Sequence, residues 1–204
     1  MKSALGIIAF FVLSACSDAT TAASSSAALD LDQVTLGDSV KARGCTFTIG
    51  TGIQPPSLPP LYVAFVRVTG NQHQCTHDDI VLGTSYAVPS TAIISAHGAI
   101  VADWTSKATP SGEAHTQLFI AEIAPQSGTI VKQTELAAMS PDFMHPQLGN
   151  VFNGALDTDG NALVVTGDKN GIIPGEIGSG DHYMATYAHF FNSSDTAPTS
   201  VIAY

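Results

Sequence analysis

Three side chains that can hold a metal ion stand at alternate positions in His73-x-Cys75-x-His77. Alternate residues of a strand point to the same face, so the two imidazoles and the thiolate would lie on one side of it. This spacing predicts a zinc or copper site if Cys75 is free. If Cys75 is paired with Cys45, the sulfur ligand is lost and two loop histidines remain.

The cysteine content favours the paired alternative. Cys45 and Cys75 are the two cysteines that follow Cys16, and two thiols in an oxidising compartment most simply form a disulfide. Such a bridge closes a loop of about 30 residues, which stabilises a protein by about 3 kcal/mol in the chain-entropy model. We therefore predict a Cys45–Cys75 disulfide and no metal ion on His73 and His77.

A second candidate is Asp157-x-Asp159-Gly160-Asn161, which begins like a calcium-binding loop. Carboxylate and amide oxygens at alternate positions can face one cation, but a full EF-hand loop ends in a bidentate glutamate where this chain has Asp168. The same residues are typical of an Asp-Gly hairpin turn. We favour the turn, and we interpret Asp168 as the start of a further turn.

No motif for nucleophilic catalysis is stronger than these. Gly178-Ser179-Gly180 departs from the Gly-x-Ser-x-Gly elbow and precedes a predicted strand, whereas that elbow leads into a helix. Aromatic residues on or near the predicted strands could line a sugar-binding surface, although packing is their usual role. These residues are Tyr62, Tyr86, Trp104, Phe119, Tyr183 and Tyr187. We predict no catalytic residue.

The charge balance excludes one class of partner. The chain has seven Lys and Arg against seventeen Asp and Glu, a formal net charge of −10. Such a surface repels phosphate backbones and lacks the basic patch that anionic lipids attract, so we expect no nucleic-acid partner. Charged residues make up only 12% of the chain and strong helix formers are sparse, which predicts an all-β fold.

The first sixteen residues have the layout of an export signal. Lys2 is followed by an apolar run over 5–13 that is too short to span a bilayer, and Leu13-Ser14-Ala15-Cys16 closes it. This tetrapeptide resembles the lipobox of bacterial lipoproteins, in which the cysteine is diacylated and becomes the new N-terminus. The resemblance implies a signal peptide over 1–15 and a lipid anchor on Cys16; an ordinary signal peptide cut nearby is the alternative.

The segment after this signal predicts a tether. Residues 16–28 are small and polar and have nothing to bury, so we expect a flexible linker with a reach of about 20 Å. In bacterial lipoproteins the residue after the cysteine influences sorting. Ser17 is not the aspartate of an inner-membrane retention signal, although Asp18 stands one place later. The resemblance therefore implies attachment to the cell envelope, at the outer rather than the inner membrane.

From residue 29 onward the chain contains an internal repeat. The stretches 61–66, 118–123 and 182–187 each have an aromatic residue second, an alanine fourth and a bulky residue sixth. Each predicts a strand, and a glycine suited to a hairpin turn precedes each one, at Gly44, Gly98 and Gly160. We predict one all-β domain over 29–204, built from four-stranded antiparallel units near 34–83, 90–138 and 150–204.

The later units resemble the repeats of exported bacterial seven-bladed β-propellers. The likeness lies in 156–167 with 180–187, and in 117–134. It implies sheets arranged as propeller blades, but propellers have four to eight blades, so three units cannot close a ring alone. A β-sandwich, or a ring completed by another subunit, is the alternative.

These features together predict a non-catalytic protein without a cofactor. Lipobox, tether and repeat indicate a lipid-anchored envelope module that binds a partner or supports an assembly. One alternative is a partial propeller completed by a protein partner or by a second copy of the chain. Another is a metal-dependent or carbohydrate-active envelope enzyme. The propeller resemblance does not choose among them, because that fold serves many unrelated roles.

Overall fold

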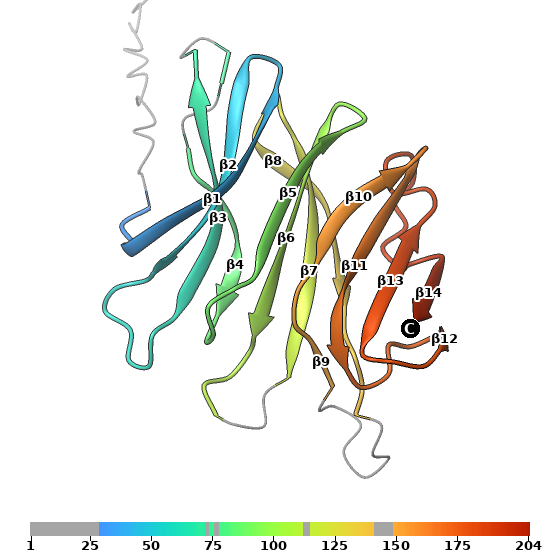
Figure 1. Cartoon of the computed structure of the whole chain (residues 1–204). Coiled ribbons are helices and arrows are strands. Elements are labelled where there is room, and N and C mark those ends of the chain that lie inside the picture. Colours follow the sequence, from blue (N-terminus) through green and yellow to red (C-terminus); the bar gives the residue numbers. More distant parts are fainter. Residues whose placement is uncertain (1–28, 72–73, 76–77, 112–114, 141–148) are drawn as a thin grey trace, which may run out of the picture.

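The computed structural model describes residues 29–71, 74–75, 78–111, 115–140 and 149–204. Within these ranges every regular element is a strand, and the strands form three sheets that follow one another across the molecule (Figure 1). The predicted all-β fold with three successive units is therefore confirmed. None of the described segments is a helix that could cross a membrane.

The first two sheets are antiparallel meanders in which neighbouring strands are also consecutive in the chain. The first consists of β1 (Asp32–Ala42), β2 (Cys45–Ile53), β3 (Tyr62–Gly70) and β4 (Ile80–Ser85). The second consists of β5 (Thr91–Ala96), β6 (Ala99–Lys107), β7 (Thr116–Ala124) and β8 (Thr129–Leu136). These sheets correspond to the first two predicted units.

The third sheet is mixed, and here the four-stranded antiparallel prediction is wrong in detail. Its strands are β9 (Asn150–Val151), β10 (Ala155–Asp159), β11 (Ala162–Asn170), β12 (Glu176–Gly178), β13 (His182–Tyr187) and β14 (Ser200–Ala203). Their order is β10-β11-β13-β14-β12, with β9 paired to the end of β11. Strand β12 runs parallel to β14 because the long connection after β11 reaches the far edge of the sheet before β13 begins.

A buried ion pair fixes that long connection. The Lys169 Nζ lies 3.1 Å from the Glu176 Oε1 and donates to the Gly171 carbonyl oxygen at 2.7 Å. The Glu176 Oε2 accepts from the Ile173 backbone N–H at 2.9 Å, so both charges are satisfied by further hydrogen bonds. Residues 168–170 lie within β11, so the predicted turn beginning at Asp168 is wrong.

Tight turns join the first two strands of the first and second sheets. Arg43 and Gly44 have φ values of 51° and 81°, and His97 and Gly98 have values of 52° and 79°. Positive φ at both central residues is the geometry of a type I′ hairpin turn, which matches the twist of paired strands and favours glycine. Gly160, with φ 57°, lies at the corresponding turn of the third sheet. The predicted glycine turns are confirmed.

The middle sheet is buried on both faces. Ile100, Ala102 and Trp104 of β6 belong to an apolar cluster shared with the first sheet, whereas Val101 belongs to a cluster shared with the third. Successive residues of a strand point to opposite faces, so a strand between two sheets must be apolar at almost every position. This explains the continuous apolar stretch at the start of β6, and it leaves Asp103 in the interior.

The repeated alanines lie in the third-strand positions of the sheets but do not all face the same way. Ala64, Ala121 and Ala185 are fully buried on β3, β7 and β13. Ala121 faces the preceding sheet, as Ala185 does, whereas Ala64 faces the following sheet beside Trp104. Ala64 lies opposite the sixth residue after the start of β2, whereas Ala121 and Ala185 lie opposite the third residue after the starts of β6 and β11. The sequence alignment of the first unit is therefore three residues out of register, and a shift by an odd number of residues exchanges the two faces of a strand.

Strand β1 is an edge strand of the first sheet and crosses over its neighbours in the view of Figure 1; its Leu36 lies opposite Gly50 of β2. A Cβ on Gly50 would lie 2.9 Å from the Leu36 side chain and 2.8 Å from the Phe65 ring, so glycine is needed for this close approach. Phe65 points away from the second sheet yet is fully buried. The outer side of the first sheet also presents Leu36 and Val81, which are 50% and 45% exposed.

Cys45 and Cys75 are joined, as the sequence predicts. Their sulfur atoms lie 2.07 Å apart, at disulfide distance, and link the start of β2 to the connection before β4. The bridge closes a loop with a sequence separation of 30. Because this sulfur is shared, Cys75 is not available as a thiolate ligand.

Replacing both residues, as Cys45→Ser with Cys75→Ser, should lower the free energy of unfolding by about 3 kcal/mol, since the unfolded chain regains the entropy of an open loop. Urea denaturation of the full chain measures the change. Treatment of the wild type with a thiol reductant should reproduce the loss. Equal stability of the oxidised wild type and the double variant would contradict the prediction.

Candidate functional site

The predicted calcium residues form a hairpin. Asp157 and Asp159 lie on β10, paired with Val164 and Ala162 of β11, and Asn161 follows Gly160 in the turn. The Asp157 Oδ1 accepts a hydrogen bond from the adjacent Thr158 N–H, and these carboxylates are exposed. Over the described ranges, no three His, Cys, Asp or Glu side chains are grouped to hold a metal ion. Residues 157–161 therefore form the hairpin turn that we favoured over a calcium site.

Three other residues singled out from the sequence lie outside the described residues. These are the predicted lipid attachment site Cys16 and the two histidines of the metal motif, His73 and His77. Ser179 is exposed between β12 and β13, with no histidine bonded to it among the described residues. The aromatic residues Trp104 and Tyr183 are buried, so packing is the role the structure gives them.

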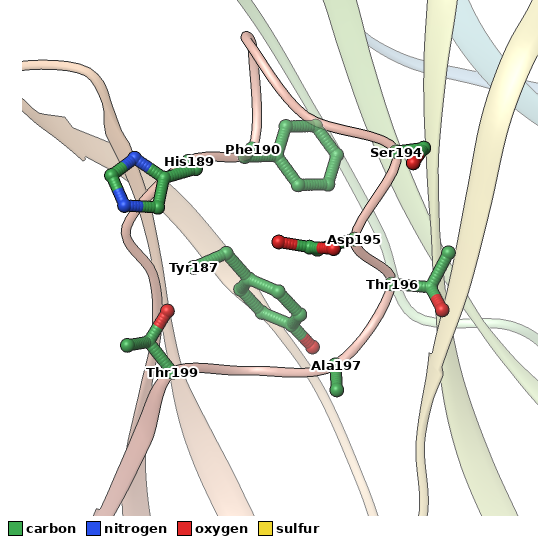
Figure 2. Close-up of a pocket in the computed structure, with 8 residues that line it drawn as sticks. All are labelled: Tyr187, His189, Phe190, Ser194, Asp195, Thr196, Ala197 and Thr199. Atoms are coloured by element: carbon green, nitrogen blue, oxygen red, sulfur yellow. The ribbon is translucent and has the colours of Figure 1, made fainter.

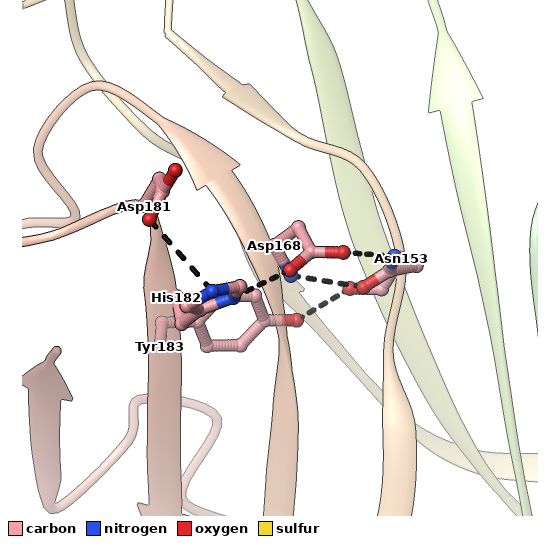
Figure 3. Close-up of polar contacts among 5 residues, drawn as sticks. All are labelled: Asn153, Asp168, Asp181, His182 and Tyr183. Atoms are coloured by element: carbon pink, nitrogen blue, oxygen red, sulfur yellow. Dashed lines mark hydrogen bonds and ion pairs between the residues drawn. The ribbon is translucent and has the colours of Figure 1, made fainter.

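Asp168 belongs to a polar cluster on the third sheet (Figure 3). Its Oδ1 lies 2.7 Å from the His182 Nδ1, and its Oδ2 accepts from the Asn153 Nδ2 at 2.8 Å. The hydrogen bonds from Asn153 and His182 lower the pKa of Asp168 below its usual value. The Tyr183 hydroxyl donates to the Asn153 carbonyl oxygen at 2.7 Å. These bonds attach the segment before β10 to β11 and β13, which is a structural task.

Asp103 is the one acidic side chain that is fully buried in the described part of the chain. Its Oδ1 accepts from the Ala92 N–H at 2.7 Å, whereas its Oδ2 has no hydrogen-bond partner and lies against Gly154. Burial raises the pKa of Asp103 well above the usual value, since the charged form loses its hydration. Glu122 of the neighbouring strand β7 is paired with Lys132 instead.

Asp103→Asn should stabilise the protein more at pH 7 than at pH 4. Because the folded pKa is raised, the folded state holds a proton that the unfolded chain has lost, so wild-type stability falls as pH rises above the unfolded pKa. The variant cannot lose stability in this way, so its free energy of unfolding at pH 7 should exceed that of the wild type by about 1 kcal/mol or more. Urea denaturation across this pH range measures it, with Asp38→Asn on exposed β1 as the control. A gain independent of pH would contradict the assignment.

Two hollows of the described surface lie around the connection between β13 and β14, residues 188–199. A groove of about 600 Å³ separates this connection from β8 and is lined by Gln133 of β8 and by Asn192 and Ser193. We call it the β8 groove. One wall of the groove is formed by the second sheet, and the other by the connection within the third sheet.

Lys132 holds the connection in place. Its ammonium group donates to the carbonyl oxygens of Phe190 and Ser193 and lies 3.3 Å from a Glu122 carboxylate oxygen. It also lies 3.9 Å from the centroid of the Phe190 ring, a cation–π contact. Thr134 adds a hydrogen bond from its hydroxyl to the Thr196 carbonyl oxygen. Alternate residues of β8 thus fasten the 188–199 connection to the middle sheet.

A second hollow of about 480 Å³ lies within the connection itself and shares Ser194 and Thr196 with the β8 groove. We call it the Tyr187 pocket. Its lining residues are Tyr187, His189, Phe190, Ser194, Asp195, Thr196, Ala197 and Thr199 (Figure 2).

Two polar groups of the Tyr187 pocket lack a well-formed hydrogen bond or ion pair. Burial raises the pKa of Tyr187 to about 12, and a side-chain contact with Thr134 offsets part of this rise, but the contact does not have the geometry of a well-formed hydrogen bond. The Asp195 carboxylate has no hydrogen bond or ion pair with any described residue, and only its backbone N–H is bonded, to the Ser193 Oγ at 3.0 Å. The sequence analysis missed this site, since its residues come together only through the turn-rich connection.

Comparison with known proteins adds no further assignment. No family model, curated protein or solved structure matches the chain.

Proposed function

We propose that this protein is a lipid-anchored module of the bacterial cell envelope that binds a ligand without catalysis. The proposal combines the lipobox at Cys16, the polar tether over 16–28 and the acidic β domain that follows. A tether of this kind keeps a domain near a membrane surface while leaving it free in the aqueous space.

The observation that carries the binding role is the pair of connected hollows, the β8 groove and the Tyr187 pocket. Hydroxyl, amide and carboxylate groups line both hollows, which are supported by two packed sheets. Lys132 fixes the 188–199 connection that forms one of the walls. Concave sites with a few fixed polar groups are the usual form of ligand sites. The polar clusters of the described residues are structural or lie apart from these hollows, which favours binding over catalysis.

Metabolic labelling with a clickable palmitate in a bacterial host tests the anchor. The wild type should be labelled and should sediment with outer-membrane fractions, whereas Cys16→Ala should be unlabelled and released into the soluble fraction, because the acyl chains are the only proposed hold on the membrane. Wild-type protein that carries no label would remove the anchor from the proposal.

A second candidate function is a partial ring completed by another subunit. The observation that favours it is the outer face of the third sheet, where Ile202 and Tyr204 are 41% and 59% exposed. Their neighbour Val201 belongs to the cluster shared with the second sheet and Ala203 is buried as well, so the face with Ile202 and Tyr204 is the one that a further sheet would cover.

Light scattering of the full chain after size exclusion in detergent distinguishes the two candidates. The partial-ring candidate requires a protein mass of at least two chains, and Ile202→Asp should reduce it to one, since a charge cannot be buried between sheets without cost. Val88→Asp is a matched control, because Val88 is 66% exposed on a connection between two sheets. A wild-type monomer would rule out a ring completed by a second copy of the chain.

A further inference from the structure

The Tyr187 pocket contains one uncompensated charge. Asp195 and His189 are its ionisable residues besides the Tyr187 hydroxyl, and the carboxylate has no counter-ion in the described part of the protein. Figure 2 shows this carboxylate directed from the connection toward the middle of the pocket, near the rings of Phe190 and Tyr187. A carboxylate in this position attracts a cation and repels an anion.

The nearest basic side chain does not neutralise this charge. The ammonium group of Lys132 is shared among Glu122, two backbone carbonyl oxygens and the Phe190 ring, and its side chain is only 8% exposed. An anionic ligand such as a phosphate or a carboxylate would therefore meet Asp195 without a free positive partner. The pocket selects against anions on charge alone.

The other walls suit a group that donates several hydrogen bonds. The Tyr187 hydroxyl is buried and makes no well-formed hydrogen bond, and Thr196 and Thr199 add hydroxyl oxygens at the rim. The rings of Tyr187 and Phe190 meet edge to face at 76°, with centroids 5.9 Å apart. The Phe190 ring already accepts an ammonium group from the β8 side, so this aromatic pair is a favourable environment for such a group.

We propose that the Tyr187 pocket binds the primary ammonium group of a small organic molecule, with Asp195 as its ion-pair partner and the Tyr187 hydroxyl as a hydrogen-bond acceptor. An ammonium group has three N–H donors and no acceptor, which matches a lining of carboxylate and hydroxyl oxygens. A volume of about 480 Å³ admits a ligand of one sugar ring or a short alkyl amine. This inference rests on the proposed binding function and names the ligand chemistry of that site.

Calorimetric titration of the full chain in detergent with D-glucosamine, cadaverine and D-glucose tests the proposal. At least one amine should bind, and which of them binds tells an amino sugar from an alkyl amine. D-Glucose should bind at least about tenfold more weakly, because it lacks the charge that Asp195 pairs with. Affinity should fall as salt is raised, as expected for a partly exposed ion pair.

Two variants locate the site. Asp195→Asn keeps the size of the side chain and should weaken amine binding at least about tenfold, whereas Asp38→Asn, which removes an equal charge on β1, should leave it unchanged. Tyr187→Phe should weaken binding by a smaller factor while the protein stays folded, as judged by its circular dichroism. Unaltered binding to Asp195→Asn, equal binding of glucose and glucosamine, or no binding of either amine would overturn the proposal. Any of these results is independent of palmitate labelling at Cys16, so failure here is distinguishable from failure of the anchor.

Discussion

The burial of the middle sheet on both faces is the constraint on which the other features depend. Strand β6 contributes Ile100, Ala102 and Trp104 to one interior and Val101 to the other, so the second sheet shares an apolar interior with each of its neighbours. Each interface is an aligned packing of two sheets, and its hydrophobic stabilisation is proportional to the apolar area removed from water. Without the second sheet, neither outer sheet would have a covered face.

This double burial also explains where polar groups occur. Asp103 lies in the interior because β6 has no solvent side at that position, and one hydrogen bond from Ala92 satisfies only half of its carboxylate. Polar pairs that are fully satisfied, such as Lys169 with Glu176, fix connections rather than strands. In the proposed ligand site, too, a charged side chain fixes a connection. Lys132 is bonded to Glu122 and to the connection, so it does not act as a counter-ion for Asp195.

Much of the fold could be predicted because it is encoded locally. Strand composition, the glycine turns at Gly44 and Gly98, and the cysteine pairing each depend on a short stretch or on a simple count. The facing of Ala64 could not, because a shift in register by an odd number of residues exchanges the faces of a strand while it leaves the pattern of residue types almost unchanged. Strand β12 was missed since it has three residues and pairs with a strand that comes later in the chain.

The candidate site was harder to predict than the fold for a related reason. Residues 188–199 contain small polar residues that are typical of turns, and nothing in their order shows that Lys132 and Thr134 of another sheet bind their carbonyl groups. A surface lysine on an edge strand usually indicates solvent exposure. Here β8 of the second sheet fixes the connection that forms a pocket in the third sheet. The sequence does not show this contact, because the two segments are far apart along the chain.

The outer faces of the first and third sheets have a consequence for assembly. Head-to-tail association requires two different complementary faces on each molecule, and it can continue into open-ended polymers when the contacts do not close. The outer face of the first sheet exposes Leu36 and Val81, and the outer face of the third exposes Ile202 and Tyr204, so the two ends of the stack of sheets differ. Contact between two copies through the same end would form a closed twofold pair, whereas contact between unlike ends would be head-to-tail.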